Sequence, residues 1–559
     1  MKLSKRPKAF FLGVSILGVI GISLSNPIKQ DYFEISKQLE IMTSVLRELN
    51  IFYVDPLSPG ELVHTGINSM LKSLDPYTIY YPEERMEDVR FISTGEYGGI
   101  GISLKENWEG KYIVSDIVEN GPAELSGVKI GDELVSVKGQ NIRGKGIDVI
   151  SDQIKGTSGT EVVIGIVKYG EESEYKFNIV REKIKTPDIP YHGMLSDKTG
   201  YLILNKFTKT ASAEVKKSII YLTDSLGAKN IVIDLRGNGG GLLREAVNIV
   251  NFFVPKGTKV VEMRGKTEAW NKSYAALRKP LFQDIPLAII IDERSASASE
   301  IVSGAIQELD RGVILGNESF GKGLVQQTKN LDYGSRMKIT VAKYYTPSGR
   351  CVQRLHYRDR DEHGDAKVKA DSALKVFHTA NGRPVLEGRG VFPDIEIEKN
   401  YMSYVLAGLI DNDLLFDFAL SRDFTIEDHR TYTLSEEDWE SFIVYVEAQF
   451  SNENRKTPYQ AESETLLNII EEVMADDGVL ASNEDALNTL QLSVSPNIRE
   501  DLTRFKTQIK KSIEEEIVFQ KTHSTGLYEY QLPRDPNAIK AVEVLESGEY
   551  KNILVGPAK

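Results

Sequence analysis

The sequence predicts a multidomain α/β protein, and three observations support that prediction. The chain has 559 residues, more than one hydrophobic core normally organises. From about Gly200 onward, apolar strand-like runs alternate with helical stretches, the pattern of parallel strands joined by crossover helices. Residues 91–183 instead show short β patterns with many glycines. We therefore expect an α/β core preceded by a smaller, mainly β domain.

The first 26 residues resemble an export segment. Four basic side chains lie among the first eight residues, and residues 9–24 then form an uncharged, largely apolar run. That run is slightly short for a membrane-spanning helix, and Ser23 and Ser25 offer a small-residue cleavage site. A buried core helix is the alternative. We expect residues 1–26 to be a signal peptide or membrane anchor, and the protein to be periplasmic, secreted or anchored to the inner membrane.

Residues 27–90 are expected to be a helical region. An amphipathic helix is indicated by apolar residues at spacings of three and four: Ile35, Leu39, Met42, Leu46 and Leu49. We expect this stripe to pack on the folded body, with a homodimer contact as the alternative.

The middle of the chain divides into a β region at 91–183 and a core at 184–400. The β region should hold strands at 98–104, 111–118, 132–139 and 160–170 and helices at 122–127 and 147–156, with a linker at 183–190. The core should hold strands at 201–207, 230–235, 286–292 and 312–315, separated by helices. Residues 401–559 are largely helical and acidic, and we expect a third, helical region there.

Two core strands end in segments that could carry chemistry. The segment Gly237–Gly241 contains four glycines between a buried strand and a helix, which lets backbone N–H groups face an anion. A tight strand-to-helix turn is the alternative. Further along, Ser295, Ser297 and Ser299 alternate with alanines at the start of a helix. One serine could cap the helix while another acts as a nucleophile.

Lys322 lies in a third such segment, VILGNESFGKGLVQ. The stretch approaches a phosphate-binding loop, but Gly323 stands where Ser or Thr would ligate magnesium. Strand-like stretches, not a helix, follow it, which argues against a nucleotide site. A buried lysine amine loses solvation, its pKa falls, and it can then act as a general base for a neighbouring serine.

Several classes of function are disfavoured by composition. The net charge of -13 argues against general nucleic-acid binding, and the single cysteine excludes an internal disulfide framework or a thiolate metal cluster. All seven histidines lie outside the three segments, so a Ser-His-Asp arrangement has no obvious base. The stretch beginning at Asp359 starts like a calcium loop but lacks its later ligands. Nothing indicates a metal or an organic cofactor.

Together these segments resemble the C-terminal processing peptidases, or tail-specific proteases, which are serine proteases with a Ser-Lys pair. The resemblance covers about residues 51–398 and rests on SLDPYTIYY, GEYGGIGISL, DLRGNGGG, SASASEI, GKGLVQ and GRGVFPDIEIE in order. Gly239 stands where the family usually has proline. The resemblance implies a crotonase/ClpP-like α/β protease core with an inserted, mainly β PDZ domain.

Residue roles follow from the resemblance alone. Ser297 would be the nucleophile, Lys322 the general base and Gln326 the residue that orients the lysine amine. An oxyanion hole would be formed by backbone N–H groups of Gly240 or Gly241 and of Ala298. The resemblance also implies that substrate tails bind to the backbone of Gly99, Ile100, Gly101 and Ile102.

The preferred hypothesis is an exported endopeptidase that selects proteins by their exposed C-terminal tails. A PDZ-based binding or scaffold protein with an inactive protease-like core is the alternative, and an acyl-CoA enzyme is a weaker one. The expected partners are protein substrates with exposed tails, with no nucleic acid and with membrane contact only through the N-terminal segment. An activating partner protein and a homodimer are left open.

Overall fold

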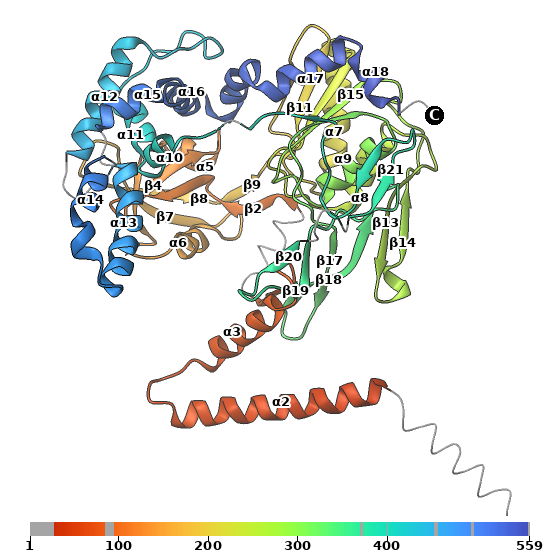
Figure 1. The fold of residues 1–559 in the computed structure, drawn as a ribbon, viewed down its shortest axis with the longest axis horizontal. Coiled ribbons are helices and arrows are strands. Elements are labelled where there is room, and N and C mark those ends of the chain that lie inside the picture. Colours follow the sequence, from red (N-terminus) through yellow and green to blue (C-terminus); the bar gives the residue numbers. More distant parts are fainter. Residues whose placement is uncertain are drawn as a thin grey trace, which may run out of the picture. The chain divides into compact units, whose positions relative to one another are not determined.

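The computed structural model describes residues 27–83, 94–368, 372, 374–399, 401–451, 457–493 and 497–556 (Figure 1). The chain forms two compact units, one ending at Tyr80 and the other beginning at Tyr81. The predicted export segment, residues 1–26, lies outside the described residues. None of the described helices combines the length and the apolar composition that crossing a membrane requires.

The first part of the second unit is a small β domain built on an antiparallel sheet. Its strands run in the order β3-β4-β5-β7-β8, with β3 at one edge. Buried apolar side chains such as Ile100, Val114, Ile150 and Ile164 form its own core. Its elements are β2 (Glu96–Gly99), β3 (Ile102–Glu106), β4 (Tyr112–Ile117), α5 (Pro122–Leu125), β5 (Glu133–Val137), β6 (Gln140–Asn141), α6 (Ile147–Ile154), β7 (Glu161–Val167), β8 (Glu174–Val180) and β9 (Glu182–Lys185).

The strands and helices predicted for this domain are present, and one expectation is wrong. The expected linker at 183–190 begins inside β9, which pairs antiparallel with β2 from Glu96↔Lys185 to Gly99↔Glu182. The two strands bracket the domain at its entry and exit. The pairing was missed because EKIK is short and polar, and the strand it joins lies about ninety residues earlier in the chain.

The core is a mostly parallel sheet in the order β10-β11-β12-β15-β16-β23. The predicted parallel pairing of its four central strands is confirmed. Strands β12 and β15 are buried at every residue, as their uninterrupted apolar runs indicated. The elements are β10 (Tyr191–Met194), β11 (Thr199–Ile203), α7 (Ala211–Ile220), β12 (Asn230–Asp234), α8 (Leu243–Asn251), β15 (Leu287–Ile291), α9 (Ala298–Glu308), β16 (Val313–Gly316) and β23 (Ile395–Glu396).

A second, antiparallel sheet contains the strand-like stretches predicted after Lys322. In this sheet β18 pairs with both β17 and β13, and β13 pairs with β14. Small hairpins complete the region. The elements are β13 (Lys259–Gly265), β14 (Lys272–Ala275), β17 (Leu324–Asn330), β18 (Arg336–Tyr345), β19 (Leu355–Arg360), β20 (Ala366–Val368), β21 (Val376–His378) and β22 (Pro384–Leu386).

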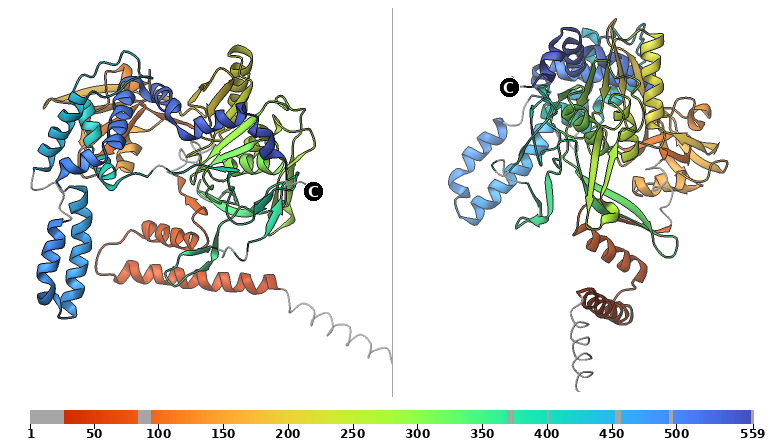
Figure 2. Two further views of the ribbon diagram at one scale, coloured as in Figure 1. Left: turned by 45° about the horizontal axis from the view of Figure 1, so that its top comes forward. Right: turned by 90° about the vertical axis from the view of Figure 1, so that its right-hand side faces the viewer.

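Helices cover both faces of the parallel sheet, and those on one face come from the far end of the chain. Helices α7, α8 and α9 pack on one face around Ile231, Ile233 and Ile289. On the other face, Val232 and Ile290 share a cluster with the last helices of the chain. These helices, coloured dark blue, lie against the core in Figures 1 and 2. The final segment is therefore part of the core.

The C-terminal region forms a helical body of its own before it reaches the core. Its cluster joins Leu409, Phe418, Phe442 and Ile513 from four helices. Side-chain caps start several of the helices, as Ser403 and Ser435 do for α10 and α12. The helices are α10 (Tyr404–Asp411), α11 (Leu414–Leu420), α12 (Glu436–Phe450), α13 (Pro458–Asp476), α14 (Leu480–Ser493), α15 (Ile498–Arg504), α16 (Lys506–Gln531), α17 (Pro536–Glu546) and α18 (Glu549–Leu554).

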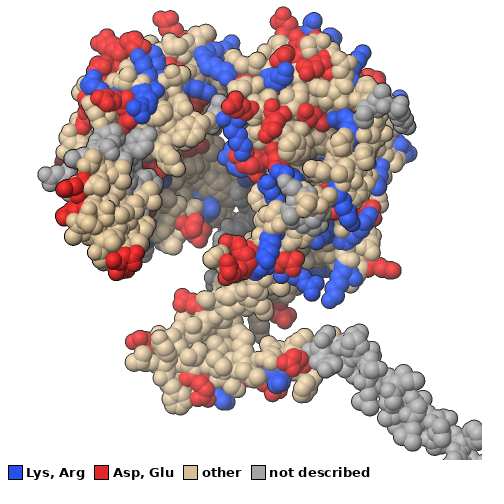
Figure 3. All heavy atoms as spheres, in the orientation of Figure 1, with Lys and Arg blue, Asp and Glu red and all other residues tan. Residues whose placement is uncertain are grey.

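Charges of both signs are mixed on the face of the molecule that Figure 3 draws. On the face drawn in Figure 3, Lys and Arg side chains alternate with Asp and Glu over the core, and acidic side chains gather over the helical region.

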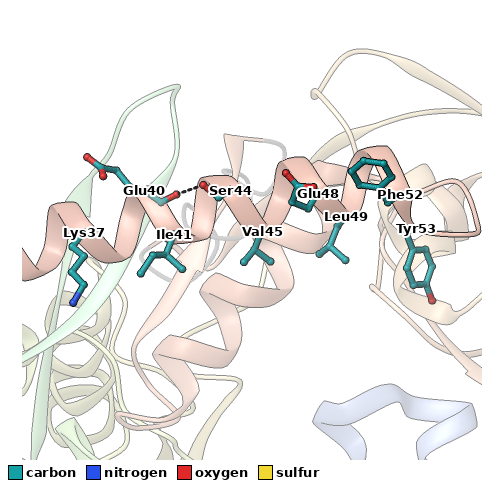
Figure 4. A pocket seen from close by; sticks show the side chains of 9 residues that line it. All are labelled: Lys37, Glu40, Ile41, Ser44, Val45, Glu48, Leu49, Phe52 and Tyr53. Carbon is teal, nitrogen blue, oxygen red and sulfur yellow. Dashed lines mark hydrogen bonds between the residues drawn. The ribbon is translucent and has the colours of Figure 1, made fainter.

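The first unit consists mainly of α2 (Pro27–Phe52) and α3 (Pro59–Lys72). The predicted amphipathic helix is present, but Ile35 and Leu39 are 53% and 58% exposed. Packing of this stripe on the folded body, and the alternative of a homodimer contact, both stay predictions. Figure 4 shows Ile41, Val45 and Leu49 projecting from one side of α2.

Candidate active site

The glycine-rich turn after β12 is fixed by one buried side chain, that of Asn238. Its amide nitrogen Nδ2 donates to the carbonyl of Leu204 (2.6 Å), and its Oδ1 accepts from the N–H of Gly240 (2.9 Å). The carbonyl of Asn238 accepts from Ala296 N (3.0 Å) and Ser299 Oγ (2.8 Å). The turn is thus bonded directly to the serine segment, as a site built from two loops requires.

The three serines of that segment have different surroundings. Ser295 is fully buried, and its Oγ donates to the carbonyl of Leu235 (2.8 Å). Ser299 is also fully buried, and its Oγ donates to the carbonyl of Asn238 (2.8 Å). Ser297 is only half-buried. The hydroxyls of Ser295 and Ser299 are therefore structural, and Ser297 is the serine of this segment that solvent or a substrate can reach.

Ser297 has a backbone conformation that few residues other than glycine adopt. Its φ and ψ are 57° and -109°, immediately before α9. Such a conformation costs about 1–3 kcal/mol and persists only where neighbouring contacts enforce it. Here the N–H of Ser297 donates to Glu300 Oε2 (2.8 Å), and its carbonyl accepts from the hydroxyl of Tyr344 (3.1 Å). Burial raises the pKa of Tyr344 well above its ordinary value, so the hydroxyl stays a donor.

Glu300 joins the serine segment to the lysine segment. The same oxygen, Oε2, accepts from the backbone N–H of Lys322 (2.9 Å), while Oε1 accepts from Ser319 Oγ (2.6 Å) and Gly321 N (2.8 Å). The side chain is fully buried. Burial raises the pKa of Glu300, and the donors around it act in the opposite direction. Ser297 and Lys322 are thereby held by hydrogen bonds to one atom.

The lysine segment leads into the antiparallel sheet. Lys322 is half-buried, two residues before β17 begins. Gln326 lies in β17, and its Nε2 donates to Thr340 Oγ1 on β18 (3.2 Å). Strand pairing between β17 and β18 therefore fixes the backbone at Gln326 and the backbone that directly follows Lys322.

The glycines of the turn touch the serine segment closely. Gly240 has φ 103°, and a Cβ added to it would lie 2.8 Å from Ser297 Cβ and 3.0 Å from Ala298 N. Gly241 has φ 151°, and a Cβ there would lie 2.4 Å from the carbonyl oxygen of Phe207. Only glycine satisfies these positions. Of the residues predicted for an oxyanion hole, Gly240 and Ala298 are thus brought together, and Gly241 follows directly against Phe207.

An ion-pair network borders the turn. Arg236 donates from Nε and Nη2 to Asp234 Oδ2 (2.9 and 2.5 Å), and its Nη2 also donates to Asp535. Tyr201 donates to the same Asp234 oxygen (2.5 Å). Burial would lower the pKa of Arg236, but the two carboxylates raise it. The guanidinium therefore stays charged between carboxylates from distant parts of the chain.

Sequence reasoning missed Glu300, Tyr344, Asn238 and Asp535. A signal for Glu300 was available, because Ser followed three residues later by Glu is the pattern of a capping box. Asn238 lies inside the quoted glycine-rich motif. No local signal marks Tyr344 or Asp535, because each reaches the site through tertiary packing.

The small β domain has a groove of about 350 Å³ between the edge strand β3 and helix α6. Of the four residues predicted to bind substrate tails, Ile100, Gly101 and Ile102 line this groove. Gly99 instead lies in β2, paired with Glu182. The helix side is lined by three residues, Ile147, Ser151 and Ile154. A strand edge beside an apolar groove can accept an extended peptide.

Among the residues that the structure describes, no group of three or more His, Cys, Asp or Glu side chains could hold a metal ion.

Three family models match the chain. Residues 198–357 match peptidase family S41, residues 89–167 match the PDZ domain, and residues 405–545 match the C-terminal helical domain of probable PDZ-proteases. These matches agree with the predicted α/β protease core, PDZ domain and helical C-terminal region, and confirm that fold class.

Individual proteins match over more than half of the chain. A carboxy-terminal-processing protease of Bartonella bacilliformis is 34% identical over 348 residues, which cover 61% of this chain and 78% of that protein. A probable CtpA-like serine protease of Staphylococcus aureus is 34% identical over 317 residues, covering 56% of this chain and 62% of that protein. A solved structure of a photosystem II D1 C-terminal processing protease is 23% identical, covers 64% of this chain and 92% of that one, and has a TM-score of 0.35.

The predicted relationship is thereby confirmed at the level of the family. The identity to the Bartonella protein extends over most of that protein's length, and the separate matches to a peptidase core and a PDZ domain occur in the same chain. The chain belongs to the carboxy-terminal-processing protease family of serine peptidases.

Proposed function

We propose that the chain is an exported serine endopeptidase that recognises the C-terminal tails of proteins through its PDZ domain and hydrolyses peptide bonds with a serine-lysine pair. One observation carries the proposal: a single buried carboxylate oxygen of Glu300 accepts the backbone N–H of both Ser297 and Lys322. A site that fixes these two backbones against each other suits a reaction in which one side chain passes a proton to the other.

In the proposed reaction, Ser297 Oγ attacks the carbonyl carbon of the scissile peptide bond while the amine of Lys322 accepts the hydroxyl proton. The tetrahedral intermediate then collapses, the C–N bond breaks, and the lysine returns the proton to the leaving amine. Water, deprotonated by the same amine, then attacks the acyl-enzyme ester; the C–O bond to Ser297 breaks, the new C-terminal carboxyl group leaves, and the lysine returns the proton to Ser297 Oγ. Gln326 orients the lysine amine, with Thr340 holding its amide group.

The oxyanion of that intermediate is assigned to the backbone N–H groups of Ala298 and Gly241. Gly240 is the other glycine considered, but its N–H already donates to Asn238 Oδ1, which favours Gly241. Ala298 is the first residue of α9, so its N–H belongs to the positive end of the helix dipole. The close approach of Gly240 to Ser297 and Ala298 supports this pairing of loops.

The PDZ domain is assigned to tail recognition. A substrate tail would add as a strand along the free edge of β3, with its carboxylate on the N–H groups near Gly101 and its side chains in the groove toward α6. Membership in a family of carboxy-terminal-processing proteases supports this substrate class. An activating partner and a homodimer remain compatible with it.

Export and domain boundaries complete the proposal. Residues 1–26 combine a basic start with an apolar run, which supports a signal peptide or an anchor and a periplasmic location. The proposed organisation continues with a helical region (27–90), the PDZ domain (91–183), the protease core (184–400) and the helical region (401–559).

The decisive experiment incubates the protein, beside Ser297→Ala and Lys322→Ala, with an unstructured protein that ends in apolar residues. Fragment formation by the parent alone would support the serine-lysine pair. If Ser297→Ala still cleaves, the assigned nucleophile is wrong. If none of the three cleaves, a PDZ-based binding protein with an inactive core becomes the better account.

A further inference from the structure

The C-terminal segment reaches the active-site turn through one carboxylate. Asp535 lies 299 residues from Arg236 in the chain, yet its Oδ2 accepts a hydrogen bond from Arg236 Nη2. Its other oxygen, Oδ1, accepts the N–H of Asn537 (2.8 Å) and so caps α17. The two oxygens of one side chain therefore have separate tasks.

This contact differs from an ordinary surface ion pair. The side chains of Arg236 and Asp535 are only 27% and 15% exposed, and that of Asp234 is 4% exposed. Exposed pairs contribute little because water and salt screen them, whereas a mostly buried pair is screened much less. The guanidinium meets two carboxylates at once, so its planar fork has a defined orientation.

Asp535 is held in place by the helix that it starts. Ala538, Ala541 and Val544 of α17 are at most 1% exposed and pack against the parallel sheet. The backbone of Asp535 therefore stays beside Arg236 as long as α17 is docked on the core. The same docking determines the position of the carboxylate.

Arg236 in turn belongs to the oxyanion turn. Its backbone N–H donates to Asp234 Oδ1 (2.8 Å), and the next residue, Gly237, donates to Asp292 Oδ1 (2.9 Å). Gly240 and Gly241 follow within five residues and have no side chains of their own to fix them. The conformation of this glycine-rich stretch therefore depends on its anchors, which are Asn238 within it and Arg236 and Gly237 at its start.

We infer that Asp535 is a positioning residue for the oxyanion turn, which makes the geometry of that turn depend on docking of the C-terminal helices. The inference rests on the proposed function, since the turn is assigned there to the oxyanion. Asp535 touches no substrate and acts through Arg236. The last helices of the chain are then part of the catalytic apparatus as well as a cover for the sheet.

The substitution Asp535→Asn separates this role from helix capping. Asparagine keeps the size of the side chain and is as good an N-cap as aspartate, but it has no charge for Arg236. A matched control is Glu543→Gln on the same helix, whose carboxylate is 59% exposed and pairs with Lys540 (3.0 Å). Asp535→Glu keeps the charge and tests for rescue.

The experiment measures kcat and KM on the tailed substrate with the full chain, together with amide hydrogen exchange of residues 235–242. We expect Asp535→Asn to lower kcat about tenfold with KM unchanged, because the oxyanion donors act mainly in the transition state. Exchange in the turn should become faster, Asp535→Glu should recover most of kcat, and Glu543→Gln should match the parent.

Other outcomes overturn the inference. Parent-like kcat and turn exchange in Asp535→Asn would show that the contact does not position the turn. An equal loss in Glu543→Gln would assign the effect to a loosened helix. If the parent shows no cleavage that depends on Ser297, the proposed function fails, but hydrogen exchange still tests the inference. Faster exchange of the turn in Asp535→Asn alone would support the positioning role of Asp535. Unchanged exchange would refute it.

Discussion

The candidate active site and the PDZ groove are both built from glycine-rich backbone, which lies beside a helix N-terminus in the core and beside a strand in the PDZ domain. The core holds this backbone fixed, whereas the PDZ domain leaves it open for pairing. In the core, Asn238 and Glu300 together hold the polar groups of three segments, and both are fully buried. In the PDZ domain, β3 is the last strand of its sheet, and its edge faces a groove of about 350 Å³.

The difference teaches where each site can accept a partner. Catalysis needs donors that are already oriented when charge develops, so the core fixes even a serine with positive φ. Recognition of varied tails needs backbone groups that are still available for pairing and side-chain pockets that tolerate different residues. The comparison predicts that substitutions in the core change kcat, whereas substitutions in the groove change KM.

The largest effect is expected from Glu300→Gln. Glutamine keeps one acceptor oxygen, so its NH₂ group must face either the N–H groups of Ser297 and Lys322 or the N–H group of Gly321. At this fully buried position the bonds of both oxygens cannot persist together. We expect kcat on the tailed substrate to fall about a hundredfold, with KM little changed. Steady-state kinetics of the purified variant would measure both constants.

Glu308→Gln controls for loss of stability. Glu308 lies on the same helix, is equally buried, and pairs with Arg350 (2.6 Å) away from the turn. The substitution should lower the melting temperature while kcat, measured well below it, stays close to that of the parent. A hundredfold loss of kcat in both variants would mean that Glu300 has no special role in the site.

The next effect should appear in the groove, with Ile147→Ser. Ile147 lines the helix side of the groove, and removing its apolar surface should weaken tail binding and raise KM about tenfold. Turnover of a short peptide without a matching tail should be unchanged. Val149→Ser is the matched control, because Val149 lies on the same helix, is 50% exposed and does not line the groove. If Ile147→Ser lowers kcat and leaves KM unchanged, the assignment of binding to the groove and of turnover to the core is wrong.

Much of the core site can be predicted from the sequence, because its strands, glycines and serines form local patterns. The apolar runs of β12 and β15, the glycines after β12 and the three alternating serines each occupy a short window, so period and residue type suffice. Ser297 can be told apart from Ser295 and Ser299 on structural grounds only when the hydrogen-bond partners of those two buried hydroxyls are known. The contribution of Asp535 and the covering of the sheet by α17 depend on contacts across about three hundred residues, for which a single sequence gives no local pattern.

A smaller effect should be seen in the dependence on pH. Burial raises the pKa of Glu300 above its ordinary value of 4.5, so the folded protein binds this proton more tightly than the unfolded chain does. Its contribution to stability is then fully present below the unfolded pKa and is lost as pH rises through the folded pKa. The ionised carboxylate is the form that accepts from all its donors, so kcat should rise over the same interval.

The measurement compares the free energy of unfolding and kcat from about pH 4.5 to neutrality in the parent and in Glu300→Gln. The parent should lose stability and gain activity across this range, relative to the variant, which has no carboxyl group at this position. If the two proteins show parallel profiles, Glu300 does not titrate in this interval and another group controls the pH dependence.

The smallest effect on catalysis is expected from Ser299→Ala. Its hydroxyl donates to the carbonyl of Asn238, which also accepts the N–H of Ala296, so the substitution removes one of two bonds to that carbonyl. We expect a loss of about 1–2 kcal/mol in the free energy of unfolding and a kcat within about threefold of the parent. Denaturant unfolding and steady-state kinetics would measure these. Complete loss of cleavage in a folded Ser299→Ala protein would move the nucleophile to Ser299 and reverse the assignment of structural and catalytic serines, since Ser297 would then be the residue without a chemical task.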